Sequence, residues 1–574
     1  MTTDNNTASG APAGTTTGSI DCDVLVVGFG KAGKTIAMTR AKAGDRVVLV
    51  EKSPSMYGGT CINVGCVPTK TLLTDAHRHA GELLAAARTG AGAGTASAGT
   101  GAGAGSTASA GTGAGSTDTA DSAARTGDSE PGTATTPSHD AAFSAARSHR
   151  DSFIGTLNAA NHAMVENTGV LVVDGHATFT GPRTVTVTGG DPAAAHPAEQ
   201  LTVTADTVVI NTGSVPVRPP IPGSDGPRVL DSTGVQMLPE RPRRLAIVGG
   251  GPIGLEFATM FAQFGTEVTV LDGSPRLLPR FDRDIADAVH ADLRDLGVTV
   301  LSGVTVEEIA DAAGAAAGSA TTAETAAAGA GGDATADAAG GDATTGATAD
   351  TAAGAPVTVT YTDADGTRRT VDADHVLLAT GRKPATDGLG LDAAGVEVTD
   401  RGAVVVDPHL RTTADGVYAA GDVAGSPQFT YVSYDDHRVI LSDRWGDGSR
   451  TTTGRLIPST TFLEPPLSQV GLGEDAARED TGARGHTLDV RVQDIRDIAV
   501  MPRPKILGQA RGRAKILVDR EDDRILGATL YCVDSQELIN LVTTAMVHGI
   551  PASAVGSGIY THPSSSEVFN ALLG

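Results

Sequence analysis

The fold is decided by the stretch Asp23-Val-Leu-Val-Val-Gly28-Phe-Gly30-Lys-Ala-Gly33, whose pattern returns in Leu245-Ala-Ile-Val-Gly249-Gly-Gly251-Pro-Ile-Gly254. Each stretch is an apolar run followed by GxGxxG and a helical sequence, and an acidic residue, Glu51 or Asp272, stands 23 positions after the first glycine. Such glycines allow a pyrophosphate to approach a helix N-terminus, while the carboxylate accepts ribose hydroxyls. The alternative is an ordinary glycine turn in an α/β unit, which two copies in one chain argue against. The sequence therefore predicts two dinucleotide-binding units.

The length of 574 residues predicts three or four domains. Three segments, residues 1–20, 89–140 and 311–355, are rich in Ala, Gly and Thr and contain almost no large apolar side chains. They cannot bury enough apolar surface to offset the entropy lost on ordering, so we expect them to be disordered.

The net charge of −24 argues against a nucleic-acid or anionic-membrane partner, because either needs a basic face. No apolar run approaches the length of a membrane span, and the N-terminus lacks the basic and apolar regions of an export signal. The four cysteines do not form the framework of a secreted disulfide-rich protein. We therefore expect a cytoplasmic protein.

A cysteine pair follows the first nucleotide unit in Gly59-Thr60-Cys61-Ile-Asn-Val-Gly65-Cys66-Val-Pro68. Residues five apart on a regular helix lie about 7.5 Å apart along the axis and point about 140° away from each other. A disulfide between them needs a distorted first turn, which Gly65 and Pro68 favour, and a helix N-terminus stabilises a thiolate. The alternatives are two inert cysteines or half of a zinc site, but Cys22 and Cys532 are isolated and no other ligand motif accompanies them. The pair is therefore predicted to be a redox-active dithiol.

With these motifs the sequence resembles the flavin-dependent pyridine nucleotide-disulfide oxidoreductases, which include dihydrolipoamide dehydrogenase, glutathione reductase and mercuric reductase. The resemblance covers nearly all of the globular sequence. Four further motifs occur in the order typical of that family: Thr212-Gly213-Ser214, Ala379-Thr380-Gly381-Arg382, Gly416-Val-Tyr-Ala-Ala-Gly421-Asp422 and His562-Pro563-Ser-Ser-Ser-Glu567.

Within the family the chain is most similar to a bacterial branch linked to reactive-chlorine resistance and copper(II) reduction. Four stretches carry this similarity: Gly28–Thr35, Met56–Asn63, Gln428–Tyr431 and Cys532–Ser535.

The resemblance implies an α/β fold with two Rossmann-like dinucleotide-binding domains, for FAD and NAD(P), and a C-terminal α+β dimerisation domain. The FAD domain would comprise residues 21–220 and 384–455, interrupted by the low-complexity insertion 89–140. The NAD(P) domain would comprise residues 221–383, with the insertion 311–355, and the interface domain residues 456–574.

The resemblance also implies the catalytic roles. Cys66 would be the sulfur next to the flavin and Cys61 the sulfur that meets the substrate. Lys70, paired with Glu256, would place a cation beside the flavin; the alternative for these two is an exposed charge each. The catalytic acid–base pair would be His562 with Glu567, reaching the dithiol of the partner subunit.

The cofactor-binding residues are also taken from the resemblance. For FAD they are Gly28, Gly30, Gly33, Glu51, Gly59, Thr60, Lys70, Gly175, Ala177, Thr212, Gly213, Ser214 and Asp422. For the nicotinamide nucleotide they are Gly249, Gly251, Pro252, Ile253, Gly254, Asp272 and Gly381.

Three features refine the prediction. Asp272 favours NADH over NADPH because a carboxylate repels the 2′-phosphate, although Arg276 is close enough in sequence to weaken this preference. Pro252 stands where several relatives carry a tyrosine that gates the nicotinamide pocket. No cysteine pair lies between Tyr560 and Gly574, which argues against mercury as the main substrate.

The leading hypothesis is an NADH-dependent flavoenzyme that reduces a small disulfide, an oxidant product or a metal ion such as copper(II), with no resident metal. The second is dihydrolipoamide dehydrogenase of a 2-oxoacid dehydrogenase complex. The third is a non-catalytic flavoprotein that serves assembly or sensing. We expect a homodimer, with contributions to the interface from Leu538, Ile539, Leu541 and Val542.

Overall fold

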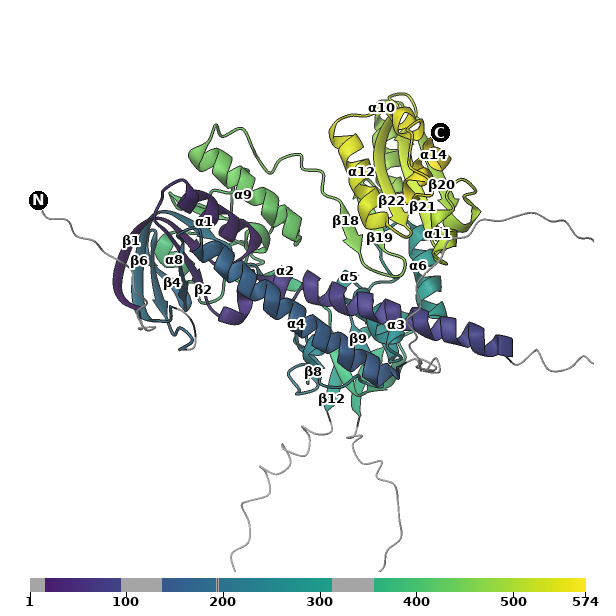
Figure 1. Cartoon of the computed structure of the whole chain (residues 1–574), viewed down its shortest axis with the longest axis horizontal. Coiled ribbons are helices and arrows are strands. Elements are labelled where there is room, and N and C mark those ends of the chain that lie inside the picture. The colour runs from purple at the N-terminus through teal and green to yellow at the C-terminus, as the bar shows by residue number, and fades with distance from the viewer. Residues whose placement is uncertain (1–15, 94–136, 193, 195, 312–355) are drawn as a thin grey trace, which may run out of the picture.

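The computed structural model describes residues 16–93, 137–192, 194, 196–311 and 356–574 (Figure 1). The predicted low-complexity insertions lie mostly outside these ranges.

The prediction of disorder is wrong at several segment ends, including residues 139–140, which begin helix α4 (His139–Glu166), and residue 311, which ends strand β12 (Thr305–Asp311). Residues 16–20 belong to strand β1 (Thr16–Val27), which pairs in parallel with β6 (Ala198–Ile210). Residues 89–93 continue helix α3 (Cys66–Ala93). Local composition missed the strand because the side of β6 that does not pair with β5 supplies the backbone hydrogen-bond partners that this polar segment needs.

The first nucleotide unit lies in a seven-stranded sheet of order β3-β2-β1-β6-β5-β4, with β17 beside β6. Strands β3, β2, β1, β6 and β17 are parallel, whereas β5 pairs antiparallel with β6 and β4 pairs antiparallel with β5. Their bounds are β2 Val47–Glu51, β3 Leu171–Asp174, β4 His176–Gly181, β5 Thr184–Thr188 and β17 Val417–Ala419. Strand β2 and the C-terminal ends of β1 and β6 are continuous buried apolar runs, as expected for a part of the sheet that is covered on both faces.

The second nucleotide unit lies in a parallel five-stranded sheet of order β11-β10-β9-β15-β8, to which the chain adds an antiparallel sheet β12-β13-β14. The bounds are β8 Val229–Leu230, β9 Arg244–Val248, β10 Glu267–Asp272, β11 Thr299–Ser302, β12 Thr305–Asp311, β13 Val357–Thr362, β14 Arg368–Ala373 and β15 His375–Leu378. The chain enters and leaves this part through two paired strands, β7 (Ser214–Pro216) and β16 (Arg382–Pro384).

The C-terminal part forms an antiparallel sheet of order β18-β19-β22-β21-β20, drawn in green to yellow in Figure 1. The bounds are β18 Ser459–Thr461, β19 Leu467–Gly471, β20 Leu488–Asp494, β21 Arg513–Asp519 and β22 Arg524–Tyr531. Its helices are α10 Glu474–Arg484, α11 Arg503–Ile506, α12 Ser535–Val547, α13 Ala552–Gly556 and α14 Val568–Leu573.

Two long helices, α3 and α4 (His139–Glu166), pack side by side and connect the first sheet with the second nucleotide unit (Figure 1). The other helices of this region are α1 Lys31–Lys42, α2 Thr60–Asn63, α5 Pro252–Gln263, α6 Arg283–Asp295, α8 Leu391–Ala394 and α9 Thr430–Trp445. Helix α3, which begins at the second cysteine, also packs on α5, which follows the second GxGxxG. This contact brings the two predicted cofactor units and the dithiol together. None of the described helices is long and apolar enough to cross a membrane.

Candidate active site

The first glycine motif is shaped by close packing against the end of β6. A Cβ on Gly28, where φ is +99°, would lie 2.5 Å from the Asn211 carbonyl oxygen, and one on Gly30 only 2.2 Å from Asn211 Oδ1. At Gly33 it would lie 2.7 Å from the Val26 side chain. Helix α1 follows with no side-chain cap at its N-terminus, so the turn has the form that accepts a pyrophosphate.

Two carboxylates lie near this turn. Glu51, at the end of β2, is buried and accepts hydrogen bonds from the amides of Phe29 (2.9 Å) and Lys52 (2.8 Å). Burial raises the pKa of Glu51 to about 7. Asp422 accepts a hydrogen bond from Ser214 Oγ at 2.6 Å, and burial raises its pKa as well. The predicted flavin residues therefore converge from segments that are far apart in the sequence.

The second glycine motif leaves open space where a pyrophosphate is expected. A Cβ on Gly249 would lie 2.5 Å from Ala379 O, and one on Gly254 2.0 Å from Gly249 O, but one on Gly251 would meet nothing within 4 Å. Helix α5 starts at Pro252, which has no amide hydrogen to satisfy, and it carries no side-chain cap. The residues present therefore fit a dinucleotide phosphate, with Ile253 in the first turn of the helix.

Asp272 ends strand β10 beside this turn, and a Cβ on Gly250 would lie 2.8 Å from its carboxylate. The prediction that Arg276 weakens the charge of Asp272 is not supported by the hydrogen bonds. The Arg276 guanidinium donates instead to backbone carbonyls, including those of Leu278 (3.1 Å) and Phe281 (2.7 Å).

The dithiol lies where a short helix ends and a long one begins. Cys61 is in α2, Cys66 is the first residue of α3, and the interruption between the helices falls at residues 64–65, in agreement with the distorted turn inferred from the sequence. Both cysteines are free thiols, Cys61 partly exposed and Cys66 exposed. Cys66 Sγ lies 3.9 Å from Thr430 Oγ1, at the start of α9.

The two thiols titrate as a pair. A hydrogen bond from Cys66 is the main cause that lowers the pKa of Cys61, to about 6, against the opposing effect of burial. The same hydrogen bond and the negative charge on Cys61 raise the pKa of Cys66. The dithiol therefore loses its first proton easily and its second with difficulty, which leaves one nucleophilic thiolate near neutral pH.

The predicted pair of Lys70 and Glu256 is present, with Nζ and Oε2 2.6 Å apart. Lys70 lies one helical turn beyond Cys66, and Glu256 lies in the first turns of α5. The other carboxylate oxygen of Glu256 accepts a hydrogen bond from the amide of Phe462 at 2.9 Å. The ion pair therefore joins the dithiol helix, the second nucleotide unit and the start of the C-terminal sheet.

The predicted acid–base pair is also formed, since His562 Nδ1 lies 2.7 Å from Glu567 Oε1. The second oxygen of Glu567 accepts a hydrogen bond from the amide of Ser564 at 2.9 Å, which orients the carboxylate. The His562 side chain is 67% exposed, and among the described residues no contact joins it to Cys61. Within one chain the imidazole is oriented but separate from the dithiol.

The remaining predicted flavin residues lie on backbone turns around the same region. Gly59, with φ of +80°, precedes Thr60 at the start of α2. The amide of Gly175 donates to Glu51 O at 2.9 Å, and Ala177 follows in β4.

The two chain crossings hold the other predicted residues. Thr212 Oγ1 donates to Ala385 O at 2.8 Å. Gly213 and Gly381 have φ of +74° and +109°, a backbone conformation that favours glycine. Gly381 O accepts a hydrogen bond from the amide of Val217 at 2.9 Å.

Sequence reasoning missed Asn211. Its Oδ1 accepts a hydrogen bond from the amide of Gly33 (2.9 Å), and its Nδ2 donates to Ala420 O (2.6 Å), so one side chain connects the first glycine motif to the segment before Asp422. The sequence signal that could have identified it is a polar residue directly after the buried strand β6.

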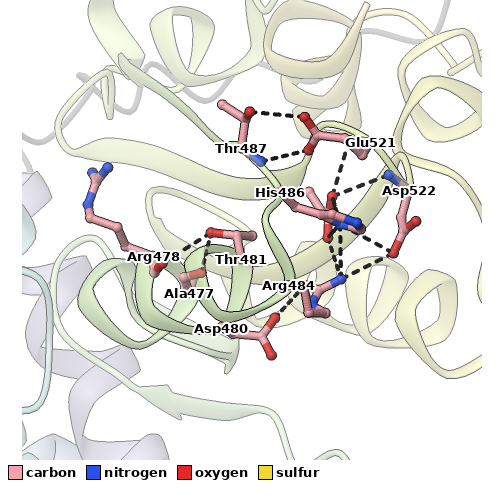
Figure 2. Close-up of polar contacts among 10 residues, drawn as sticks. Ala477, Arg478, Asp480, Thr481, Arg484, His486, Thr487, Glu521 and Asp522 are labelled. Atoms are coloured by element: carbon pink, nitrogen blue, oxygen red, sulfur yellow. Dashed lines mark hydrogen bonds and ion pairs between the residues drawn. The ribbon is translucent and has the colours of Figure 1, made fainter.

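A second group of ionisable side chains lies in the C-terminal part (Figure 2). His486, Asp519 and Glu521 offer ligand atoms within 4.8 Å of one another, as a metal site requires. However, Arg484 lies 2.6 Å from Asp519, and Glu521 already accepts two hydrogen bonds from Thr487. The guanidinium supplies the positive charge that a metal ion would supply, so this network is a structural ion-pair cluster.

The expected apolar contributors to a dimer interface need a correction. Leu538, Ile539 and Val542 are at most 2% exposed and belong to the core of the C-terminal part, whereas Leu541 is 49% exposed. The helical repeat of α12 turns the first three toward β22 and β19, which the apolar composition of the segment did not show.

Comparisons with known proteins cover nearly the whole chain. The model of the family described as pyridine nucleotide-disulphide oxidoreductase matches residues 22–339 and 333–436, and the model of the dimerisation domain of that family matches residues 457–573.

The chain is 36% identical over 551 residues to the probable pyridine nucleotide-disulfide oxidoreductase RclA of Escherichia coli, covering 96% of this chain and 98% of the relative. It is 28% identical to dihydrolipoyl dehydrogenase of Geobacillus stearothermophilus, covering 96% of this chain and 95% of that protein. The solved Cu(II) complex of the HOCl-induced flavoprotein disulfide reductase RclA of E. coli superimposes with a TM-score of 0.73 at 35% identity, covering 96% of this chain and 99% of that one.

Proposed function

The chain belongs to the pyridine nucleotide-disulphide oxidoreductase family, as a FAD-dependent enzyme that uses NAD(P)H, and on this premise we propose that its Cys61–Cys66 dithiol reduces copper(II) or a small disulfide. The observation that carries the proposal is the asymmetric dithiol beside the Lys70–Glu256 ion pair. The similarity to a flavoprotein disulfide reductase solved as a Cu(II) complex supports copper(II) as an acceptor.

FAD, when bound, accepts the hydride of the nicotinamide and passes electrons to the disulfide. The turn at Gly28–Gly33, with Glu51, would hold its adenosine and pyrophosphate, and Asp422 with Ser214 would hold its ribityl chain. The turn at Gly249–Gly254, with Asp272, would hold the nicotinamide nucleotide, and the Asp272 carboxylate, which accepts no hydrogen bond from Arg276, favours NADH.

Cys61 and Cys66 have different roles in the proposed reaction. Two electrons and one proton convert the Cys61–Cys66 disulfide into one thiolate and one thiol. Two copper(II) ions then take one electron each, or one small disulfide takes both, and the Cys61–Cys66 bond forms again as the remaining thiol proton leaves. Cys61 is the sulfur assigned to the acceptor, and Lys70 places a positive charge beside the dithiol helix.

The proposed active site is complete only in a homodimer. The match to a dimerisation domain agrees with a dimer, and the exposed, Glu567-oriented imidazole supports the transfer of the thiol proton by His562 of the partner subunit. The domain division into residues 21–220 with 384–455, residues 221–383 and residues 456–574 follows the three main sheets. Its N-terminal boundary moves to residue 16, where β1 begins.

The test is an acceptor panel on the purified holoenzyme. NADH oxidation is measured with copper(II) and with small disulfides, and dihydrolipoamide oxidation is measured with NAD. Turnover with copper(II) or a disulfide that is lost in Cys61→Ser supports the proposal. Turnover confined to dihydrolipoamide with NAD would favour the dihydrolipoamide dehydrogenase alternative, and bound flavin without any turnover would favour a non-catalytic flavoprotein.

A further inference from the structure

Lys34 is a buried cation that forms no ion pair with any residue that the structure describes. It follows the third glycine of the first motif, lies in the first turns of α1, and is 5% exposed. Buried lysines are nearly always paired with an acid. Among the described residues, however, no ion pair includes Lys34, and its ammonium donates a hydrogen bond to the neutral side-chain oxygen of Asn161. Burial, and then the charge of Lys31, lower the pKa of Lys34 to about 8.

Asn161 connects this cation to the segment that carries Cys61. A Cβ on Gly58 would lie 3.1 Å from Asn161 Cγ, so the loop before Cys61 passes directly over the amide. One helical turn earlier on α4, Asn158 donates hydrogen bonds to Pro54 O (3.1 Å) and to Asn63 Oδ1 (3.0 Å). Helix α4 therefore holds both the dithiol loop and the Lys34 side chain.

We propose that Lys34 is a positioning residue that provides the buried counter-charge of the reduced dithiol, stabilising the Cys61 thiolate from the side of α1 and α4. The proposal rests on the proposed function only in taking Cys61 and Cys66 as the redox pair. When the disulfide is reduced, the negative charge that arises on Cys61 lies near a buried cation that no described carboxylate neutralises.

The charges around Cys61 distinguish Lys34 from Lys70. Both lysines lower the pKa of Cys61, after the hydrogen bonds from Cys66 and Thr430. Lys70 is already paired with Glu256, which neutralises much of its charge, whereas Lys34 forms no ion pair among the described residues and its pKa responds to the charges of Lys31 and Cys61. The attraction is mutual, because the Cys61 thiolate in turn raises the pKa of Lys34.

The electrons and protons of the reduction step balance while Lys34 remains protonated. Electrons from NAD(P)H, two per disulfide, and one proton from solvent convert the neutral disulfide into one thiolate and one thiol. The new negative charge then pairs with an ammonium that was already present, so the charge of Lys34 makes this reduction more favourable. Without that charge, the pKa of Cys61 is higher, so the thiolate already takes up a proton at a higher pH.

The test follows alkylation of Cys61 by iodoacetamide in the reduced holoenzyme as a function of pH, with mass mapping to separate Cys61 from the other thiols. Lys34→Met should move the midpoint of the profile up by about one pH unit, which slows alkylation near pH 6 up to tenfold while the rate above pH 9.5 stays unchanged. Lys42→Met, an exposed lysine on the same helix, is the matched control and should leave the profile in place.

A second variant covers the case in which Lys34→Met does not fold. Asn161→Asp places a carboxylate against the ammonium and should shift the profile in the same direction. An unchanged midpoint in both folded, flavin-loaded variants, or a rate that falls equally at every pH, would overturn the proposal. Because alkylation needs no electron acceptor, the result is independent of whether copper(II) or a disulfide is the substrate.

Discussion

Lys70 Nζ lies 2.6 Å from Glu256 Oε2, and this contact ties the dithiol helix α3 to the helix that follows the second glycine motif. Glu256 is only 8% exposed and uses its other oxygen to accept the Phe462 amide. One carboxylate therefore aligns three parts of the chain that must act together for electrons to pass from nicotinamide to dithiol.

Replacing Glu256 should impair this alignment. Glu256→Gln keeps an acceptor for the Phe462 amide but removes the charge, and a hydrogen bond to a charged group contributes about 1.5–3 kcal/mol. We expect flavin reduction by NADH, measured by stopped-flow absorbance, to slow at least about tenfold. Glu267→Gln, an exposed glutamate on β10, serves as the control. Equal rates in the two variants would contradict a role for the ion pair.

The roles of the two cysteines can be separated by absorbance. In Cys61→Ser, Cys66 remains as the only sulfur beside the oxidised flavin, and we expect a long-wavelength charge-transfer band. Cys66→Ser should lack the band, and both variants should lose disulfide reduction. A band in Cys66→Ser and none in Cys61→Ser would reverse the assignment.

The nicotinamide preference depends on Asp272. Arg276 donates its hydrogen bonds to backbone carbonyls and not to the Asp272 carboxylate, so it does not compete with ribose hydroxyls for that group. We expect kcat/KM for NADH to exceed that for NADPH at least about tenfold, which corresponds to about 1.4 kcal/mol. Asp272→Asn should lower the ratio of kcat/KM for NADH to kcat/KM for NADPH. An equal or higher value for NADPH in the wild type would refute the assignment.

Subunit exchange tests whether the active site is shared. Cys61→Ser and His562→Ala should each be inactive as homodimers, whereas a mixed dimer would contain one site with both lesions and one site with neither. Random pairing after dissociation and reassociation should restore about a quarter of the wild-type sites, measured as acceptor turnover. If subunits exchange without any recovery, His562 does not act on the dithiol of the partner subunit.

The ion-pair cluster in Figure 2 should contribute a pH-dependent stability. The hydrogen bond to Asp519 raises the pKa of His486 above its ordinary value of 6.5, so this contribution is full below 6.5 and is lost as the pH rises through the raised value. Hydrogen bonds from His486 and its neighbours outweigh burial and lower the pKa of Asp519 to about 2, so its contribution persists above 3.8 and is lost as the pH falls toward 2.

The expected result is a difference in Tm between wild type and His486→Asn that is largest between pH 4 and 6.5 and shrinks above that range. His176→Asn, on an exposed strand residue, controls for the loss of a histidine as such. A Tm difference that does not change with pH would show that His486 contributes only through packing.

The sequence alone determined the parts of this protein whose chemistry needs particular residues at a fixed spacing. The turn at Gly28–Gly33 must be built from glycines because a Cβ would collide with Asn211, and the pair Cys61–Cys66 needs a distorted helix start. Each requirement fixes residue types over a short stretch, so it leaves a recognisable pattern in the sequence even where the colliding residue, Asn211, is distant in the chain. The Rossmann-like units, the dithiol and the His562–Glu567 pair could all be predicted for this reason.

Only the tertiary structure decided which distant side chains meet. Lys34 and Asn161 are 127 residues apart, and Gly33 and Asn211 are 178 residues apart, so no spacing rule joins them. Leu538 is another example of what the sequence left open. Its apolar character suggested a surface between subunits, but in the structure it packs in the core. Burial and partner charge are properties of the folded neighbourhood, and they determine whether a lysine is a solvated surface group or a counter-charge for a thiolate.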